Sequence, residues 1–140
     1  MPCRAFLDTN ALLDLMFAGR PGSDALCRIA DAHAAGACTL LIAASSLKDV
    51  YYIARKELSD DVLREWIAYF LDEFEVVALD RAACRIAVNS DEPDFEDGVM
   101  RAMAETHDAS CIVSRDKRAF RASTVRRLEP DDLVRMLDAQ

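Results

Sequence analysis

Short apolar runs alternate along the chain with longer stretches in which apolar residues recur at helical spacing. The short runs predict strands at residues 4–7, 38–43, 74–79, 110–113 and 125–128. The longer stretches predict helices at residues 9–16, 23–35, 47–54, 59–71, 81–89 and 95–105, and a last helix that begins at Pro130. Because strands separated by helices pair through right-handed crossovers, this order predicts an α/β fold. Its sheet should be mainly parallel and covered by helices on both faces.

Most of the predicted helices begin beside a side chain that can accept hydrogen bonds from free backbone amides. The candidate capping residues are Thr9 or Asn10, Ser23 or Asp24, Ser45 or Ser46, Ser59, Asp80 and Asp94. In a parallel sheet, ligands bind at the carboxyl ends of the strands, where the strand order reverses. We therefore expect the chemistry of this protein among the residues that directly follow the strands.

The composition is that of an ordinary globular protein. The chain has 140 residues, of which 52% are hydrophobic and 30% charged, and this predicts one folded domain over residues 1–140. The longest apolar run is far shorter than the roughly 20 residues that a membrane span needs. Residues 1–8 also lack the basic, apolar and cleavage regions of a signal peptide. We therefore expect a cytoplasmic protein that does not associate with a membrane.

The net charge of −8 argues against a protein coated for general nucleic-acid binding. The charge is unevenly distributed, however, because residues 115–135 contain seven basic and four acidic side chains and therefore carry a charge of +3. The rest of the chain then carries −11. This distribution predicts a basic edge beside an acidic body.

Five cysteines are present, and neither their number nor their spacing indicates a cysteine-based site. The number is odd, there is no Cys-x-x-Cys pair, and the two histidines do not complete a zinc set with them. We therefore expect reduced thiols in a cytosolic core, rather than a disulfide scaffold, a zinc site or a thiol oxidoreductase. The cysteines are Cys3, Cys27, Cys38, Cys84 and Cys111.

Four aspartates occupy positions from which their carboxylates can meet. Asp8 ends the first predicted strand and Asp116 follows the fourth, whereas Asp49 and Asp97 each lie one turn into a helix. If the first and fourth strands are neighbours, these carboxylates converge on one rim of the sheet. Crowded carboxylates raise one another's pKa, and a divalent cation removes that cost. Mg²⁺ or Mn²⁺ prefers such oxygen ligands and can activate water for attack on a phosphodiester.

Each of these acids also has a simpler interpretation, which for Asp8 is a solvated turn at the end of the strand. Ser46-x-x-Asp49 and Asp94-x-x-Asp97 both resemble capping boxes, in which a carboxylate in the first turn satisfies free amides and interacts with the helix dipole. Asp116 lies in the basic segment and can form a solvated salt bridge there. The site interpretation therefore depends on all four acids together.

The segments around these aspartates resemble the motifs of PIN-domain ribonucleases. Leu7-Asp8-Thr9-Asn10 resembles the opening signature of that family, and residues 45–53 resemble the helix that carries its second acid. Residues 93–97, Pro-Asp-Phe-Glu-Asp, are similar to a segment of one bacterial branch, and residues 113–120 resemble the strand-four motif. The four motifs follow the family order over nearly the whole chain.

The resemblance implies a three-layer α/β/α fold around a parallel sheet of about five strands. It also implies Mg²⁺- or Mn²⁺-dependent cleavage of single-stranded RNA. Many similar bacterial proteins are the toxin of a VapBC-type toxin–antitoxin pair, which implies a cognate antitoxin and a homodimer. The chain departs from the family pattern at two positions: the second acid, commonly Glu, is Asp49, and Ala119 stands where an acid usually precedes Phe120.

We therefore expect a metal-dependent endoribonuclease without a protein nucleophile. Asp8, Asp97 and Asp116 match residues that hold the ion, with Asp49 and Asp94 in support. Thr9 and Asn10 match the polar residues that support the first acid. The basic candidates for contact with the RNA backbone are Arg115, Lys117, Arg118 and Arg121, which otherwise form a solvated face. The alternative is a catalytically degenerate PIN-like module that binds RNA or protein.

Overall fold

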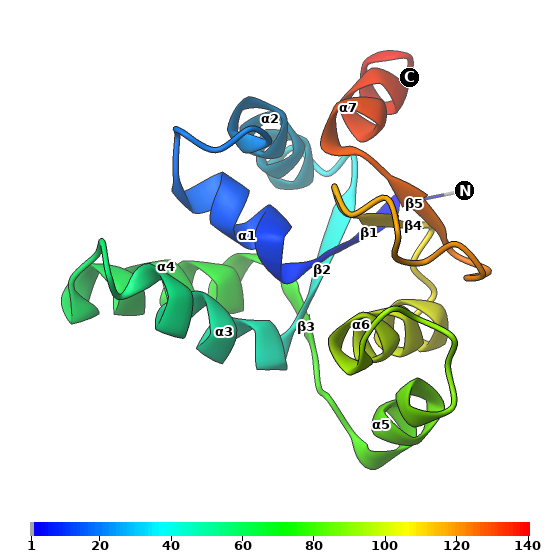
Figure 1. The fold of residues 1–140 in the computed structure, drawn as a ribbon. Coiled ribbons are helices and arrows are strands. Elements are labelled where there is room, and N and C mark those ends of the chain that lie inside the picture. Colours follow the sequence, from blue (N-terminus) through cyan, green and yellow to red (C-terminus); the bar gives the residue numbers. More distant parts are fainter. Residues whose placement is uncertain (1) are drawn as a thin grey trace.

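The computed structural model describes residues 2–140, which form an α/β fold with five parallel strands and seven helices (Figure 1). The strands are β1 (Arg4–Leu7), β2 (Thr39–Ala43), β3 (Glu75–Val77), β4 (Cys111–Val113) and β5 (Arg126–Leu128). The helices are α1 (Thr9–Met16), α2 (Ser23–Ala34), α3 (Ala44–Ala54), α4 (Asp60–Glu73), α5 (Arg81–Val88), α6 (Phe95–Thr106) and α7 (Pro130–Asp138). The predicted order of strands and helices is therefore confirmed.

The strands lie in the order β3-β2-β1-β4-β5, and every neighbouring pair is parallel. β1 is the central strand, and its last residue, Leu7, pairs with Ile42 on one side and Val113 on the other. The first and fourth strands are thus neighbours at the point where the strand order reverses. The residues that follow them, Asp8 and Ser114, therefore leave the sheet side by side.

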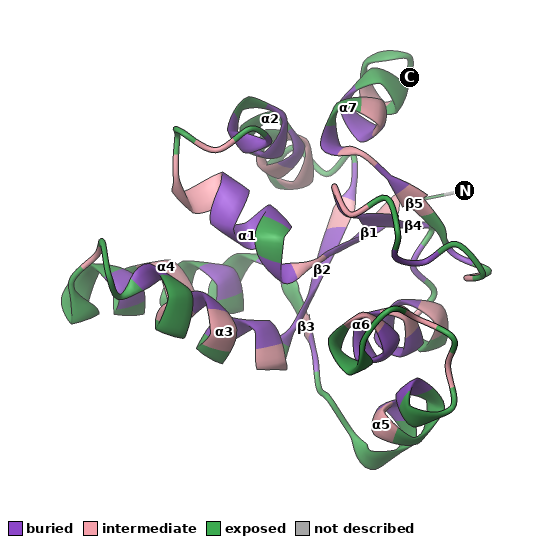
Figure 2. Ribbon diagram, viewed as in Figure 1, coloured by how far each residue is buried: buried purple, intermediate pink, exposed green. Residues whose placement is uncertain are grey.

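The helices form two layers, one on each face of the sheet. On one face, β1 and β2 contribute Ala5, Leu7, Leu40 and Ile42 to a core shared with α1, α2, α3, α4 and α7. On the other face, the alternate residue Phe6 and its neighbours pack against α5 and α6. Burial on both faces explains why the central strands read as continuous apolar runs (Figure 2). The three-layer arrangement is the one that the family resemblance implies.

Several of the predicted helix caps are confirmed. Ser59 accepts a hydrogen bond from the backbone N–H of Val62 at the start of α4. Asp80 and Asp94 cap α5 and α6 in the same way. The third strand, by contrast, is shorter than predicted, because it is an edge strand whose pairing with β2 spans only Glu75–Val77.

Three other cap predictions were wrong. α1 is capped by Asp8, which accepts a hydrogen bond from the backbone N–H of Ala11, and not by Thr9 or Asn10. α2 follows Gly22 without a side-chain cap from Ser23 or Asp24. α3 follows β2 directly, so neither Ser45 nor Ser46 can occupy the capping position. The Ser46-x-x-Asp49 sequence is therefore not a capping box.

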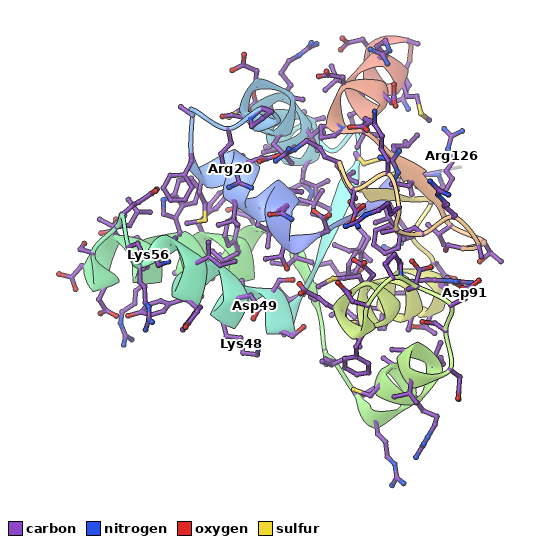
Figure 3. The ribbon with its side chains drawn as sticks, viewed as in Figure 1. Arg20, Lys48, Asp49, Lys56, Asp91 and Arg126 are labelled. Atoms are coloured by element: carbon purple, nitrogen blue, oxygen red, sulfur yellow. A yellow bond between two sulfur atoms is a disulfide. The ribbon has the colours of Figure 1, made fainter. Side chains whose placement is uncertain are left out.

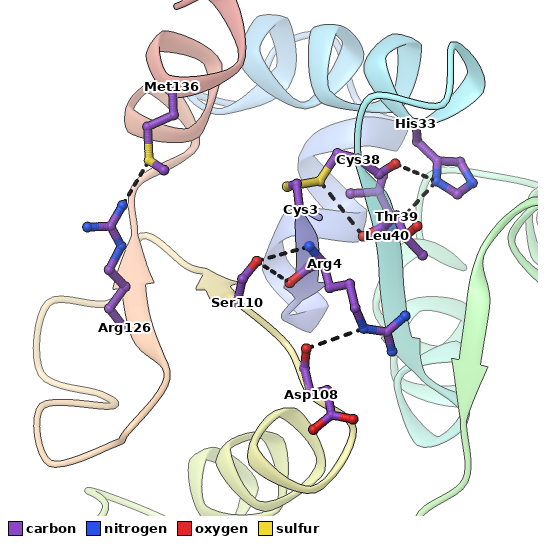
Figure 4. Close-up of a disulfide and its surroundings, with 10 residues drawn as sticks. All are labelled: Cys3, Arg4, His33, Cys38, Thr39, Leu40, Asp108, Ser110, Arg126 and Met136. Carbon is purple, nitrogen blue, oxygen red and sulfur yellow. Dashed lines mark hydrogen bonds between the residues drawn. A yellow bond between two sulfur atoms is a disulfide. The ribbon is translucent and has the colours of Figure 1, made fainter. Parts of the chain in front are cut away.

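The prediction that every cysteine is a reduced thiol was wrong, because Cys3 and Cys38 form a disulfide (Figure 4). These two residues directly precede β1 and β2, and the strand register pairs their successors, Arg4 and Thr39. The parallel register therefore brings the two sulfur atoms together, which the spacing along the chain does not reveal. Of the remaining cysteines, Cys27 is exposed, Cys84 is half-buried and Cys111 is buried, and all three are free thiols.

Within residues 2–140, no helix is both long enough and apolar enough to cross a lipid bilayer.

Candidate functional site

A cavity of about 340 Å³ lies at the carboxyl ends of β1 and β4 and is lined by Asp8, Asn10, Arg115 and Asp116. Asp8 and Asn10 belong to the junction between β1 and α1, whereas Arg115 and Asp116 belong to the loop after β4. The backbone N–H of Asp8 also donates to the carbonyl of Val113 at 3.3 Å, which fixes the two segments against each other. Four of the residues singled out in the sequence therefore share one cavity.

Asp8 is a half-buried acid held by its own helix. Its Oδ1 accepts a hydrogen bond of 2.8 Å from the backbone N–H of Ala11. Burial raises the pKa of Asp8 above its usual value, hydrogen bonds from Ser114 and Ala11 lower it, and the nearby charge of Asp14 raises it further. Since the net effect is a raised pKa, the ionised Asp8 carboxylate is a group that gains from a nearby positive charge.

Thr9 and Asn10, which follow this acid, make different contacts. The hydroxyls of Thr9 and Ser46 lie 2.9 Å apart in a buried hydrogen bond, which joins the first turn of α1 to the first turn of α3. Asn10 is exposed, and its Oδ1 accepts a hydrogen bond from Arg20 at 3.2 Å. Thr9 therefore fixes the helices behind Asp8, whereas Asn10 lines the cavity itself.

Asp116 is held in the turn that follows β4. Its backbone N–H donates to the hydroxyl of Ser114 at 3.1 Å, and its Oδ1 accepts from the backbone N–H of Arg118 at 2.9 Å. The guanidinium of Arg118 lies 3.7 Å from the same carboxylate. This contact matches the solvated salt bridge considered from the sequence, but the carboxylate also lines the cavity.

Asp97 lies one turn into α6 and is crowded by other acids. Its backbone N–H donates to Oδ1 of Asp94 at 2.8 Å, so Asp94 is the predicted cap of α6, whereas the reciprocal bond from the Asp94 N–H to the Asp97 carboxylate is not formed within residues 2–140. The pKa of Asp97 is raised to about 7, mainly by burial and then by the charges of Asp94, Asp116 and Glu92. The effect of Asp116 on Asp97 means that acids from α6 and from the loop after β4 interact at this rim.

Asp49 lies farther along the same rim, on α3 (Figure 3). Its Oδ1 is 2.9 Å from the ammonium of Lys48, and 34% of its side chain is exposed. After burial, the charge of Asp49 is the largest cause of the raised pKa of Glu96 on α6. Asp49 therefore forms an ion pair with Lys48 and repels Glu96, and it does not line the cavity around Asp8.

The chemistry of these acids fits a hard divalent cation. Asp8 and Asp97 both have raised pKa values, and a divalent cation supplies the positive charge that would offset this cost. Carboxylate and amide oxygens are also the ligands that Mg²⁺ and Mn²⁺ prefer. Across residues 2–140, however, no three His, Cys, Asp or Glu side chains already form a group that could hold an ion. Three of these acids could therefore hold one ion together only after their side chains move closer to one another.

Among the basic candidates, Arg115 is half-buried and paired with an acid, and the other three are exposed. Arg115 donates two hydrogen bonds of 2.9 Å to the buried carboxylate of Asp14. Lys117, Arg118 and Arg121 are exposed on the loop after β4, where Arg121 also donates to the carbonyl of Lys117. The three exposed side chains can approach a phosphate backbone, whereas Arg115 acts from a fixed position in the cavity wall.

Sequence reasoning missed Asp14 and Glu92. The side chain of Asp14 is 1% exposed and binds both Arg20 and Arg115. The side chain of Glu92 is 2% exposed and pairs with Arg101 on α6. An acid inside the apolar stretch Leu12–Leu15 was a detectable signal for Asp14, since a buried acid requires a partner. No local signal marks Glu92, because its partners lie in distant segments.

Comparisons with known proteins agree with this architecture. A family model described as the PIN domain matches residues 4–118. A search of curated protein sequences returned no match. Among solved structures, FitAB bound to an IR36 DNA fragment has a TM-score of 0.68 at 19% identity, with 90% of this chain and 94% of that chain covered.

Two further structures share the fold. VapC20 from Mycobacterium tuberculosis, described as a sarcin-ricin loop cleaving toxin, has a TM-score of 0.65 at 16% identity, over 80% of this chain and 89% of that chain. A toxin–antitoxin complex from Klebsiella pneumoniae has a TM-score of 0.65 at 19% identity, over 90% of this chain and 97% of that chain. With the sheet order, the position of the acids and the family match all in agreement, the chain belongs to the PIN domain family.

Proposed function

We propose that this protein is a Mg²⁺- or Mn²⁺-dependent endoribonuclease that cleaves phosphodiester bonds in single-stranded RNA. The observation that carries the proposal is the crowding of acids around the cavity: Asp8 and Asp116 line it, and the charges of Asp94 and Asp116 help to raise the pKa of Asp97 to about 7. A protein that only needed helix caps would not gain from this repulsion, which is relieved when a divalent cation binds. Membership of the PIN domain family supports the same conclusion.

In this proposal, Asp8, Asp97 and Asp116 hold the ion, while Asp94 and Asp49 add negative charge around it. The bound ion supplies the positive charge that activates a water and offsets charge on the phosphate. Asp8 is positioned by the N–H of Ala11 and by the hydrogen bond from Ser114. Lys117, Arg118 and Arg121 attract the RNA backbone at the edge of the cavity.

We further propose that the chain is the toxin of a toxin–antitoxin pair and works as a homodimer with a cognate antitoxin partner. This part of the proposal rests on the similarity in fold to a toxin–antitoxin complex and to VapC20. Coexpression with the product of a neighbouring open reading frame, followed by copurification and an activity assay, tests it. We expect the copurified complex to be inactive in RNA cleavage, and we expect this protein to cleave RNA once the two proteins are separated.

Cleavage of a fluorescent single-stranded RNA tests the nuclease proposal directly. We expect cleavage with Mg²⁺ or Mn²⁺, none in excess EDTA, and a loss of at least about a hundredfold in Asp8→Asn and Asp116→Asn. Asp80→Asn is the matched control, because Asp80 is also an aspartate that caps a helix after a strand, but it lies outside the cavity. Asn caps about as well as Asp, so this control should stay active. Cleavage that persists in Asp8→Asn and Asp116→Asn would contradict the proposal.

A binding module without turnover is the second candidate. It is favoured by one observation, namely that no three acidic side chains already form an ion-binding group within the described residues 2–140. Such a module would bind the RNA equally well with and without EDTA and would leave it intact over hours. The same assay therefore separates the two functions.

A further inference from the structure

The carboxylate of Asp14, on the buried face of α1, is bound by two arginines from different segments. Nε of Arg20 donates to its Oδ1 at 2.7 Å, and Arg115 donates from Nε to Oδ2 and from Nη2 to Oδ1, both at 2.9 Å. The Asp14 side chain is 1% exposed. A carboxylate this deeply buried is stable only when it is paired and hydrogen-bonded, and the two arginines meet that need.

Gly22 closes the remaining side of this carboxylate. A Cβ atom added at Gly22 would lie 2.2 Å from Oδ2 of Asp14 and 3.0 Å from its Cγ. The residue directly before α2 therefore has to be glycine for Asp14 to keep its present position. Since the two arginines bond to both of its oxygens and Gly22 lies against Oδ2, the Asp14 carboxylate has little freedom to move.

Both arginines extend from Asp14 to the candidate site. Arg115 lines the cavity together with Asp8, Asn10 and Asp116. Arg20 donates from Nη2 to Oδ1 of Asn10 at 3.2 Å. The two hydrogen bonds to Asp14 use Nε and Nη2 of Arg115, and its third nitrogen, Nη1, makes no hydrogen bond within residues 2–140. One edge of this guanidinium is thus fixed, and the other remains able to donate.

We propose that Asp14 is a positioning residue, which holds Arg115 in the cavity wall so that Nη1 donates to a phosphate oxygen of the bound RNA. This inference rests on the proposed nuclease function and assigns the phosphate contact to one fixed arginine. A guanidinium held at two nitrogens is already oriented for the phosphate and loses little freedom on binding. A lysine in the same place has no planar fork and cannot be held in this way.

The sharpest test moves Asp14 without removing any charge. Gly22→Ala forces the carboxylate away from its position, whereas Gly19→Ala is the matched control, since no atom lies within 4 Å of a Cβ added there. We expect Gly22→Ala to raise the KM for the RNA substrate about tenfold, the typical effect of losing one hydrogen bond to a charged group, with kcat nearly unchanged. Gly19→Ala should behave as wild type.

The salt dependence of RNA binding supplies a readout that a purely structural role would not change. The loss of one phosphate contact lowers the slope of log K against log salt by about 0.7 for a single strand. Arg115→Lys is the second variant, for use if Gly22→Ala does not fold. If Arg115 only neutralises Asp14, the lysine preserves KM and the slope, and the inference is overturned. If Arg115 contacts phosphate, KM rises about tenfold and the slope falls.

Failure of this inference and failure of the nuclease proposal give different results. If wild type cleaves RNA and both Gly22→Ala and Arg115→Lys are folded with unchanged KM and salt slope, then Asp14 does not position Arg115 for phosphate. If wild type does not cleave RNA with either metal, the nuclease proposal fails. The salt slopes are then measured by fluorescence anisotropy with a labelled RNA oligonucleotide in EDTA. If Gly22→Ala and Arg115→Lys then give the same salt slope as wild type, the inference about Asp14 is overturned as well.

Discussion

The carboxylate of Glu92 accepts a hydrogen bond of 2.7 Å from the backbone N–H of Phe120. Phe120 has a φ of 67°, in the left-handed region that residues other than glycine avoid, and this contact helps to hold it there. Glu92 also pairs with Arg101 on α6 at 3.0 Å. The loop before α6 is therefore tied to the loop after β4, and these two loops bear Asp94 and Asp116.

Glu92→Gln should lower the free energy of unfolding by about 1–3 kcal/mol. The substitution removes the buried negative charge that pairs with Arg101. It also weakens the hydrogen bond from the backbone N–H of Phe120, which stays buried. Urea unfolding at pH 7 measures the change. Asp91→Asn is the matched control, because Asp91 also lies 3.0 Å from Arg101 but 74% of its side chain is exposed. Equal urea midpoints for the two variants would show that Glu92 does not hold the loops together.

Asp97→Asn should stabilise the metal-free protein, and more so at pH 8 than at pH 5. The pKa of Asp97 is about 7 in the folded protein, against an ordinary value of 3.8. Between pH 3.8 and about 7, the folded state keeps a proton on Asp97 that the unfolded state has released, so the free energy of unfolding falls as the pH rises. The raised pKa values of Asp8 and Glu96 also lower the free energy of unfolding as the pH rises. Asp97→Asn should therefore weaken the pH dependence of stability without abolishing it.

Urea unfolding in EDTA, at constant ionic strength, measures this pH dependence. Asp80→Asn serves as the control, because Asp80 is the cap of α5 and Asn caps a helix about as well as Asp. Identical pH profiles for wild type and Asp97→Asn would rule out repulsion at Asp97.

Mn²⁺ should raise the melting temperature of the wild-type protein, and the increase should be larger at pH 8 than at pH 5.5. A ligand that binds only the folded state stabilises it by RT ln(1 + L/Kd), where L is the free ligand concentration. At the lower pH, the proton on Asp97 competes with the ion, because the pKa of Asp97 is about 7. Differential scanning fluorimetry measures the shift, and Asp8→Asn should lose most of it. A shift that is the same in Asp8→Asn would place the ion elsewhere.

Reduction of the Cys3–Cys38 disulfide should destabilise the fold by about 3–4 kcal/mol, as expected from the loop entropy for a sequence separation of 35 residues. Urea unfolding with and without dithiothreitol measures the effect, and the Cys3→Ala/Cys38→Ala protein should match the reduced wild type. RNA cleavage at 25 °C should be unaffected, because the disulfide precedes β1 and β2 whereas the cavity follows β1 and β4. Cys27→Ala, at an exposed free thiol, is the control. Equal stability with and without reductant would contradict the prediction.

The sequence was sufficient to predict the order of the elements and the type of fold. Runs such as Leu40–Ile42 are apolar without alternation because a central parallel strand is buried on both faces. Such a run therefore predicts a sheet with helices on both sides. The start of α3 could not be predicted in this way. Serine is a common capping residue, but the hydroxyl of Ser46 forms a hydrogen bond with the hydroxyl of Thr9 on another helix. Local propensity cannot indicate such a tertiary contact.

The candidate site was predictable only in outline. Asp8 and Asp116 follow adjacent strands and line one cavity, as their positions in the chain indicated. The partners that fix the site, Asp14 and Glu92, act through contacts with Arg115 and Phe120 in distant segments. The Cys3–Cys38 disulfide depends in the same way on the register between two strands. These contacts depend on how distant segments lie against one another in the fold, and a single sequence does not specify this.

The central place of β1 has a consequence for biosynthesis. Of the five strands, β1 is translated before the others, yet its pairing on one side requires β4, whose Cys111 lies opposite Ala5. Asp8 and Asn10 therefore leave the ribosome long before Arg115 and Asp116 exist to face them across the cavity. A nascent or prematurely terminated polypeptide that stops short of β4 has the first acid but no pocket around it. The complete pocket thus forms only after β4 and the loop that bears Arg115 and Asp116 have been synthesised.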